Sequence, residues 1–255
     1  MNILIIGGGA MGGSMALRLF SCDHEVAVFE REKQTNNMLR DRGIKTGRHL
    51  EDLLVKRDLV ILAVPMNVEE ALLEELNFSS TVMDVASVMT PFQKIARRRM
   101  LRFVSGHPMA GNEFAGSAGW DVHIFENRPF LLSPSPFANQ DDIDTVIEIT
   151  NCLGSRPKIV EPLSHDRMLS RISQSIYYLS RAAIVLGRGF EEYTGPGFAS
   201  TTRLGKQNQE MVVDMARYNG SNIVESLKEA ESYLREVRMA IESGDLEELN
   251  KIIQR

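Results

Sequence analysis

A histidine, His107, directly follows an apolar stretch and precedes a proline, in the run SGHPMAG at residues 105–111. The apolar stretch at residues 102–106 predicts a buried β-strand, so His107 would stand at its carboxyl end. Ligands of open α/β sheets bind outside these ends, and a neutral imidazole accepts a proton near pH 7. The residues alone leave two interpretations open: a proton acceptor presented to a ligand, or a structural histidine.

A second candidate site is the run IIGGGAMGG, which contains Gly7, Gly9 and Gly12 in the spacing G-x-G-x-x-G. It follows a strand pattern and opens a helical one, which is the context of a dinucleotide-binding turn. The first glycine permits a tight bend, the second lets the backbone approach a pyrophosphate, and the third packs the helix on the strand. Met11, inside the turn, is a further candidate cofactor contact.

The choice of cofactor is expected to depend on Glu30, which ends the second apolar run roughly 20 residues beyond the turn. A carboxylate there binds the ribose hydroxyls and repels a 2′-phosphate, which favours NAD. Arg31 keeps NADP as the alternative, because an adjacent guanidinium binds that phosphate. Val64 and Pro65, at the end of a third apolar run, complete the predicted cofactor contacts.

The other histidines indicate no metal site. His24 and His49 are expected on the surface, and His123 in a loop with no clear partner. His165 is expected to cap or pack a helix rather than face a cleft. No His, Cys and Asp cluster has the spacing of metal ligands, so we predict no metal.

The elements that would position these residues alternate between short apolar runs and helical stretches up to about residue 160. Runs rich in β-branched residues predict strands at 2–7, 25–30, 59–65, 81–87, 102–106, 128–134 and 156–162. Such alternation predicts an α/β fold with a parallel sheet covered on both faces.

Beyond about residue 160 the pattern becomes all-helical. Residues 165–186 have apolar side chains at helical spacing, and the second half is apolar on nearly all sides. Gly195, Pro196 and Gly197 break the chain, and further helices are expected near 207–217 and 220–243. These helices are too few to bury the apolar segment, so we expect a homodimer in which a second copy completes the core.

Composition narrows the partners and the compartment. The 255 residues carry a net charge of −5, which argues against nucleic acid and anionic membranes as partners. No apolar run approaches the length of a membrane span, and we expect no targeting signal. Cys22 and Cys152 form no C-x-x-C, which fits a reducing cytoplasm but leaves their pairing open.

Several runs together resemble the prephenate and arogenate dehydrogenases, the oxidative enzymes of tyrosine synthesis. The likeness follows the order of almost the whole chain and rests on SGHPMAGNE, MGGSMA, DVASV, IFENRPFLLSP and the triplets HDR and TTR. It implies an N-terminal Rossmann dinucleotide-binding domain at residues 1–160 and an all-α substrate and dimerisation domain at residues 161–255. The implied reaction is the NAD-dependent oxidative decarboxylation of prephenate, a small-molecule substrate, to 4-hydroxyphenylpyruvate.

The resemblance also implies roles for individual residues. His107 matches the histidine that takes the proton from the ring hydroxyl, and Ser87 matches a serine that bonds this hydroxyl and orients the histidine. Arg203 matches an arginine that binds a substrate carboxylate. Glu113 matches a glutamate near the cleft mouth, and Ser173 a serine that faces the substrate from the central helix.

The chain departs from the family pattern at three positions. Met89 replaces a common lysine, Val212 a common tryptophan, and Tyr177 a second helix histidine, which makes Tyr177 a candidate substrate contact. These changes leave the substrate open, with arogenate as the first alternative. A β-hydroxyacid dehydrogenase would need a lysine that residues 163–187 lack. A non-catalytic NAD-binding sensor would not need Ser87, His107 and Arg203 together.

Overall fold

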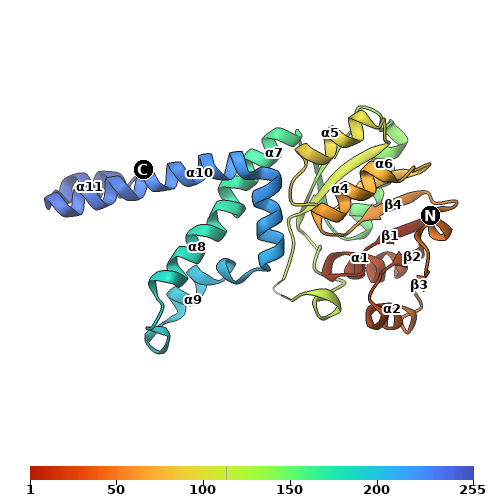
Figure 1. Cartoon of the computed structure of the whole chain (residues 1–255), viewed down its shortest axis with the longest axis horizontal. Helices are drawn as coiled ribbons and strands as arrows, with labels where there is room; N and C mark the ends of the chain where they lie inside the picture. The colour runs from red at the N-terminus through yellow and green to blue at the C-terminus, as the bar shows by residue number, and fades with distance from the viewer. Residues whose placement is uncertain (113) are drawn as a thin grey trace. The chain divides into compact units, whose positions relative to one another are not determined.

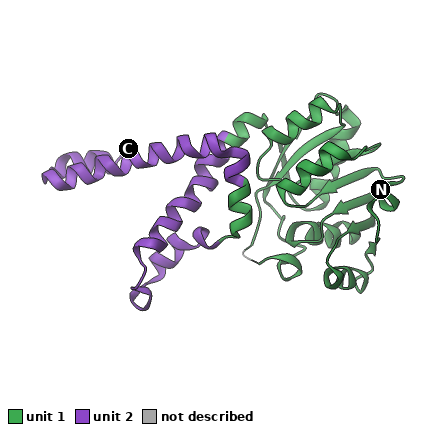
Figure 2. Cartoon of the chain, in the orientation of Figure 1, with its two compact units in different colours: residues 1–166, 207–214 green, residues 167–206, 215–255 purple. Residues whose placement is uncertain are grey.

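The computed structural model describes residues 1–112 and 114–255. The chain forms two compact units: residues 1–166 with 207–214, and residues 167–206 with 215–255 (Figure 2). No helix of the described residues is long and apolar enough to cross a membrane.

The first unit is built on a sheet that includes β1 to β4 (Figure 1). The sheet has eight strands in the order β3-β2-β1-β4-β5-β6-β7-β8. Its strands are Asn2–Ile6 (β1), Glu25–Phe29 (β2), Lys45–Thr46 (β3), Leu59–Leu62 (β4), Thr81–Asp84 (β5), Phe103–Pro108 (β6), Pro129–Pro134 (β7) and Arg156–Ile159 (β8). Neighbours from β3 to β6 are parallel, β7 is antiparallel to β6, and β8 is parallel to β7. The order reverses between β1 and β4, which is where sheets of this order bind dinucleotides. The predicted fold class is confirmed.

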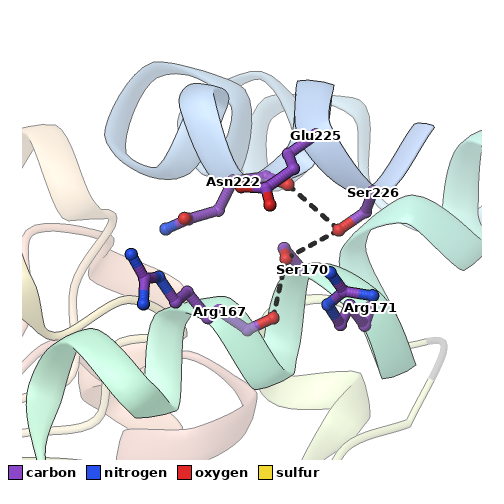
Figure 3. A pocket seen from close by; sticks show the side chains of 6 residues that line it. All are labelled: Arg167, Ser170, Arg171, Asn222, Glu225 and Ser226. Atoms are coloured by element: carbon purple, nitrogen blue, oxygen red, sulfur yellow. Dashed lines mark hydrogen bonds between the residues drawn. The ribbon is translucent and has the colours of Figure 1, made fainter. Parts of the chain in front are cut away.

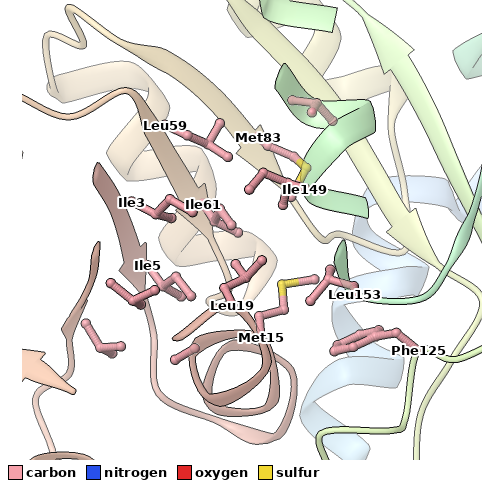
Figure 4. Close-up of a cluster of buried hydrophobic side chains, with 14 of the residues drawn as sticks. Ile3, Ile5, Met15, Leu19, Leu59, Ile61, Met83, Phe125, Ile149 and Leu153 are labelled. Atoms are coloured by element: carbon pink, nitrogen blue, oxygen red, sulfur yellow. The ribbon is translucent and has the colours of Figure 1, made fainter. Parts of the chain in front are cut away.

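Helices of the first unit pack their apolar side chains against this sheet. They are Ala10–Phe20 (α1), Lys33–Arg40 (α2), Leu50–Leu54 (α3), Met66–Glu75 (α4), Thr90–Arg98 (α5) and Gln140–Cys152 (α6), with a short 3₁₀ turn at Gly116–Gly119 (η1). Figure 4 shows Ile3 and Ile5 of β1, two residues apart and therefore on one sheet face, in a core shared with Met15 of α1 and Ile149 of α6. All four are fully buried, and each such side chain stabilises the fold by roughly 1.5–3 kcal/mol.

The pairing of the two cysteines, which the sequence leaves open, is a disulfide in the structure. Cys22 follows α1 and Cys152 ends α6, at a sequence separation of 130. The bond ties together two helices that share the core.

The second unit is helical, as predicted. Its elements are the end of Pro162–Leu169 (α7), a π-helical turn at Ser170–Gln174 (η2), Ser175–Leu186 (α8), Glu191–Tyr193 (η3), Pro196–Thr202 (α9), Leu204–Lys206 (η4), most of Gln209–Ser243 (α10) and Leu246–Ile253 (α11). The two helices expected near 207–217 and 220–243 are the arms of α10, which joins them through a non-helical Asn219 (φ −129°, ψ 19°).

Candidate active site

The segments that carry the predicted site leave the sheet at one edge, because β1, β4, β5 and β6 are parallel neighbours. The glycine turn follows β1, and Val64 and Pro65 follow β4. Ser87 is half-buried in the loop after β5, and His107 lies on the adjacent β6. The strand expected to end at residue 106 continues to Pro108, because β7 pairs with it there.

The glycine turn fits a dinucleotide. Gly7 has φ +103°, and a Cβ there would lie 2.2 Å from the carbonyl oxygen of Ala63, so only glycine is tolerated. A Cβ on Gly12 would lie 2.0 Å from the Gly7 oxygen, which shows how closely α1 packs on the turn. A Cβ on Gly9 would have no neighbour within 4 Å among the described residues, so the turn is open on the side where a pyrophosphate would approach.

Trp120 supports this turn, a contact that the sequence analysis missed. Its Nε1 donates to the carbonyl oxygens of Gly8 at 3.0 Å and Gly9 at 3.1 Å. A Cβ on Gly13 would lie 1.8 Å from the same nitrogen, so Gly13 leaves the space that the indole fills. The Arg42 guanidinium lies 5.3 Å from the ring centroid, within cation–π range. The extra glycine after the motif was the only signal of this packing.

Glu30 lies beside the turn, as the cofactor prediction requires. Its Oε2 accepts from the Gly8 N–H at 2.7 Å, and its Oε1 from the Glu32 N–H at 2.8 Å. A cavity of about 410 Å³ next to it is lined by Glu30 and by four basic side chains: Arg31, Lys33, Arg40 and Arg48. The cations outnumber the carboxylate, so the charge of this cavity does not by itself exclude a 2′-phosphate.

His107 stands at the end of a hydrogen-bonded chain of three side chains. Its Nδ1 lies 2.9 Å from Nε2 of His165, and Nδ1 of His165 lies 2.9 Å from Oδ1 of Asp166. Asp166 also accepts from the backbone N–H groups of Met89 at 2.8 Å and Thr90 at 2.9 Å, where α5 begins. The sequence favours a capping or packing role for His165, whereas the structure places it against the candidate base.

The order of these bonds fixes the tautomer of each ring. An ionised Asp166 only accepts, so His165 donates from Nδ1 and its Nε2 carries a lone pair. His107 must then donate from Nδ1 to that nitrogen. The lone pair of His107 therefore lies on Nε2, which is the atom that can take a proton from a ligand.

The surroundings of His107 and Asp166 lower the pKa values of both groups. Burial and the neighbouring His165 lower the pKa of His107 to about 3, although Asp166 opposes the shift. Burial raises the pKa of Asp166, but hydrogen bonds from His165 and from the start of α5 bring it below its usual value. At neutral pH His107 is therefore a neutral base and Asp166 an anion.

The remaining predicted residues belong to the second unit, except one. Ser173 lies in the π-helical turn, a feature frequent at functional sites. Tyr177 is buried in α8, with its ring edge-on to Tyr178 at 5.2 Å. Arg203 is exposed at the end of α9. Glu113 lies outside the described residues.

A small pocket in the second unit contains none of the predicted residues (Figure 3). Its lining is Arg167, Ser170, Arg171, Asn222, Glu225 and Ser226. Several of these groups already have partners within the protein. The Ser170 and Ser226 hydroxyls are hydrogen-bonded at 2.9 Å, and Arg171 forms an ion pair with Glu229. Nowhere in the described ranges do three His, Cys, Asp or Glu side chains gather as a metal would require.

Comparison with known proteins matches both parts of the chain to one family. Residues 14–158 match the nucleotide-binding domain of prephenate dehydrogenase, and residues 161–255 match its dimerization domain. A prephenate dehydrogenase of Lactococcus lactis is 23% identical over 96% of this chain and 72% of its own length.

Two solved structures resemble the whole chain. The arogenate dehydrogenase of Synechocystis has a TM-score of 0.84 at 26% identity, with 100% of this chain and 96% of that one covered. The prephenate dehydrogenase of A. aeolicus, solved with hydroxyphenyl propionate and NAD+, has a TM-score of 0.90 at 23% identity, with coverage of 100% and 95%.

Proposed function

The chain belongs to the prephenate dehydrogenase family, and from this we propose that it oxidises and decarboxylates prephenate to 4-hydroxyphenylpyruvate with reduction of NAD. The observation that carries the proposal is the chain from Asp166 through His165 to His107. It presents a neutral imidazole at the carboxyl edge of the sheet, beside the strand that leads to Ser87.

His107 acts as the general base in this proposal. Prephenate loses a hydride from the carbon that bears its ring hydroxyl, and the bound nicotinamide supplies the acceptor. The hydroxyl becomes acidic as the hydride leaves, so a weak but neutral base suffices to take its proton on Nε2. The carboxylate on the opposite ring carbon leaves as carbon dioxide, and its bonding electrons make the ring aromatic. The proton held by His107 then returns to the phenolate oxygen of the product.

His165 and Asp166 hold the base in its productive state. The bond from His107 Nδ1 to His165 keeps the lone pair on Nε2, and the Asp166 carboxylate stabilises the positive charge that follows proton transfer. Ser87 is proposed to bond the same substrate hydroxyl. These roles are positioning and electrostatic, whereas the proton itself goes to His107.

Other residues are proposed to hold the substrate and the cofactor. Arg203 would bind a substrate carboxylate, and Ser173, Tyr177 and Glu113 would contact the rest of the substrate. Gly7, Gly9, Met11, Gly12, Glu30, Arg31, Val64 and Pro65 are the proposed cofactor contacts, with NADP as the alternative to NAD. Arogenate is the alternative substrate, which the likeness to the Synechocystis enzyme supports.

We further propose a homodimer formed through residues 161–255, which we take as the substrate and dimerisation domain after a nucleotide-binding domain at 1–160. Support comes from the family's dimerization domain and from exposed apolar side chains on the second unit: Val185, Leu186, Val224, Leu234 and Ile241 are all at least half exposed. Light scattering at micromolar concentration tests this, and a monomer would contradict it.

A cytoplasmic location is a separate proposal, and the Cys22–Cys152 disulfide provides its test. Reducing compartments keep most such bonds open. Protein quenched directly from its cells should then show free thiols at both positions, and a persistent disulfide would count against a cytoplasmic location.

The experiment that tests the function is an assay of nicotinamide reduction with prephenate and with arogenate, each with NAD and NADP. We expect turnover of prephenate with NAD. Turnover of neither substrate would refute the proposed function.

A further inference from the structure

Two carboxyl groups are buried together behind the proposed base. Glu69 of α4 and Asp84, the last residue of β5, both have 0% of their surface exposed. Within the described residues, neither Glu69 oxygen nor Asp84 Oδ2 has a hydrogen-bond partner. Ionised carboxylates only accept hydrogen bonds, and an isolated buried charge is costly.

The two groups interact electrostatically, because the charge of Asp84 acts on Glu69. Burial raises the pKa of Glu69 well above its usual value, and the charge of Asp84 adds to this. Burial also raises the pKa of Asp84, to about 7, although the hydrogen bond from the backbone of Gly106 opposes the shift. Two like charges buried together do not both ionise readily, so one proton stays with the pair near neutral pH.

Asp84 contacts the strand that carries the proposed base. Its Oδ1 accepts from the backbone N–H of Gly106, the residue before His107. Asp84 is itself the last residue of β5, the strand that leads to the loop of Ser87. One carboxyl group therefore joins the end of β5 to β6.

Gly106 makes this close approach feasible. A Cβ there would lie 2.6 Å from the carbonyl oxygen of Asp84 and 2.9 Å from the ring of Phe130. The absence of a side chain lets the N–H reach the carboxyl group directly, so any displacement of Asp84 is passed to the backbone of the base.

We propose that Glu69 and Asp84 share one proton and form a positioning pair, which holds His107 in place through the N–H group of Gly106. The inference rests on the proposed function only in calling His107 the base. Loss of the shared proton leaves two buried negative charges that repel, so the pair loosens its hold as pH rises. Glu69 is a residue for which the sequence offered no signal beyond its place on a helix.

The charges around the pair are few. Of the charged groups in the described residues, only Asp84 acts on Glu69, and only Glu69 acts on Asp84. His165 and Asp166 act on His107 rather than on the pair. The alkaline response of the pair is therefore separable from the titration of the histidines.

Two substitutions of Glu69 distinguish the effect of the shared proton from the effect of side-chain packing. Glu69→Gln keeps a donor toward Asp84 but cannot lose it, whereas Glu69→Leu keeps the volume and removes the donor. Glu75→Gln, an exposed carboxylate on the same helix, is the matched control. We expect Glu69→Leu to lower kcat roughly 10–100-fold, the range of a slightly misplaced catalytic group, with Glu69→Gln losing less.

The pH dependence is the decisive readout. Because the folded pKa values are raised, stability from this pair is complete below the unfolded pKa of 3.8 and is lost as pH rises from there through about 7. Thermal melting from mildly acid to alkaline pH should show a falling Tm in the wild type and in Glu75→Gln, and a flatter curve in Glu69→Gln. The alkaline limb of kcat/KM should shift to higher pH in the same variant.

A measurement without turnover keeps the two proposals distinguishable. The side-chain NMR signals of His107, identified by their loss in His107→Asn, should shift at alkaline pH in the wild type but not in Glu69→Gln. Superimposable melting curves and histidine shifts in the two proteins would overturn the shared proton. If those differ while neither prephenate nor arogenate is oxidised, the pair stands and the proposed function fails.

Discussion

The Nδ1 atom of His107 lies 2.9 Å from the Nε2 atom of His165, although 58 positions separate the two residues in the sequence. The first belongs to β6 and the second to α7. Because Asp166 accepts from the far side of His165, the contact determines which nitrogen of His107 is free. This relationship orients His107, the proposed base, at the end of its strand.

Replacement of His165 should therefore impair the reaction more than the fold of the cofactor domain. We expect His165→Asn to lower kcat roughly 10–100-fold, because His107 loses the partner that fixes its tautomer and direction. NAD affinity, measured by titration calorimetry, should change little. His123→Asn, at an exposed histidine paired with Glu126, is the control and should resemble the wild type. An unchanged kcat in His165→Asn would remove His165 from the mechanism.

The plot of kcat/KM against pH should show no fall near pH 6.5, where an ordinary histidine is protonated. Protonation disables His107 as a base, and a pKa lowered to about 3 moves that loss far below the usual histidine range. We expect kcat/KM to change little on this account between about pH 5 and pH 8. A fall with a midpoint near 6.5 would show that His107 titrates as an ordinary exposed imidazole.

The same shift has a consequence for stability. His107 binds a proton near pH 6.5 when unfolded and only near 3 when folded, so its contribution is present above 6.5 and is lost as pH falls between these values. His107→Asn should therefore melt with a smaller drop in Tm over that interval. An identical drop in the two proteins would contradict the depressed pKa.

Trp120 should contribute to nucleotide binding through the glycine turn. Trp120→Phe keeps most of the ring and removes the indole N–H that is shared between the oxygens of Gly8 and Gly9. The loss of this hydrogen bonding costs about 1 kcal/mol. We expect the Kd for NAD to rise roughly 3–10-fold, with kcat at saturation less affected. Tyr233→Phe, on an exposed tyrosine of α10, is the matched control. Equal NAD affinities would show that the indole only fills space.

Cofactor preference should depend on Glu30 and its basic neighbours. NAD should be preferred in kcat/KM, and Glu30→Ala should reduce this preference, because the carboxylate no longer repels a 2′-phosphate. If NADP is instead the better cofactor, the cations of the adjoining cavity outweigh Glu30, and Arg31→Ala should selectively weaken NADP. Titration with both nucleotides decides between these outcomes.

Local patterns predicted the features that depend on neighbours in sequence. The glycine turn, the apolar strands and the position of His107 at a strand end all follow from spacing over a few residues. The two arms of α10 were likewise visible, whereas the kink at Asn219 that joins them was not. Roles carried by resemblance, such as those of Arg203 and Ser173, remain proposals.

The contacts that organise the site cross the fold and left little trace in the sequence. Trp120 meets the glycine turn across more than a hundred positions, and Asp166 reaches Met89 across 77. Glu69 sits on a helix whose other acidic residues are exposed or partly exposed, so composition did not distinguish it. Such groups are recognised only when burial and partners are known.

The central claim is that His107 takes the substrate proton, and the turnover of His107→Asn tests it most directly. Asparagine keeps a hydrogen-bonding group but accepts no proton, so kcat with prephenate should fall roughly 10²–10⁴-fold while NAD binding and Tm at neutral pH stay close to the wild type. Arg203→Ala provides the contrast, with a rise mainly in KM from the loss of a charge-assisted bond worth roughly 1.5–3 kcal/mol. If His107→Asn turns over prephenate and arogenate within a few-fold of the wild type, His107 is a structural histidine and the mechanism is wrong.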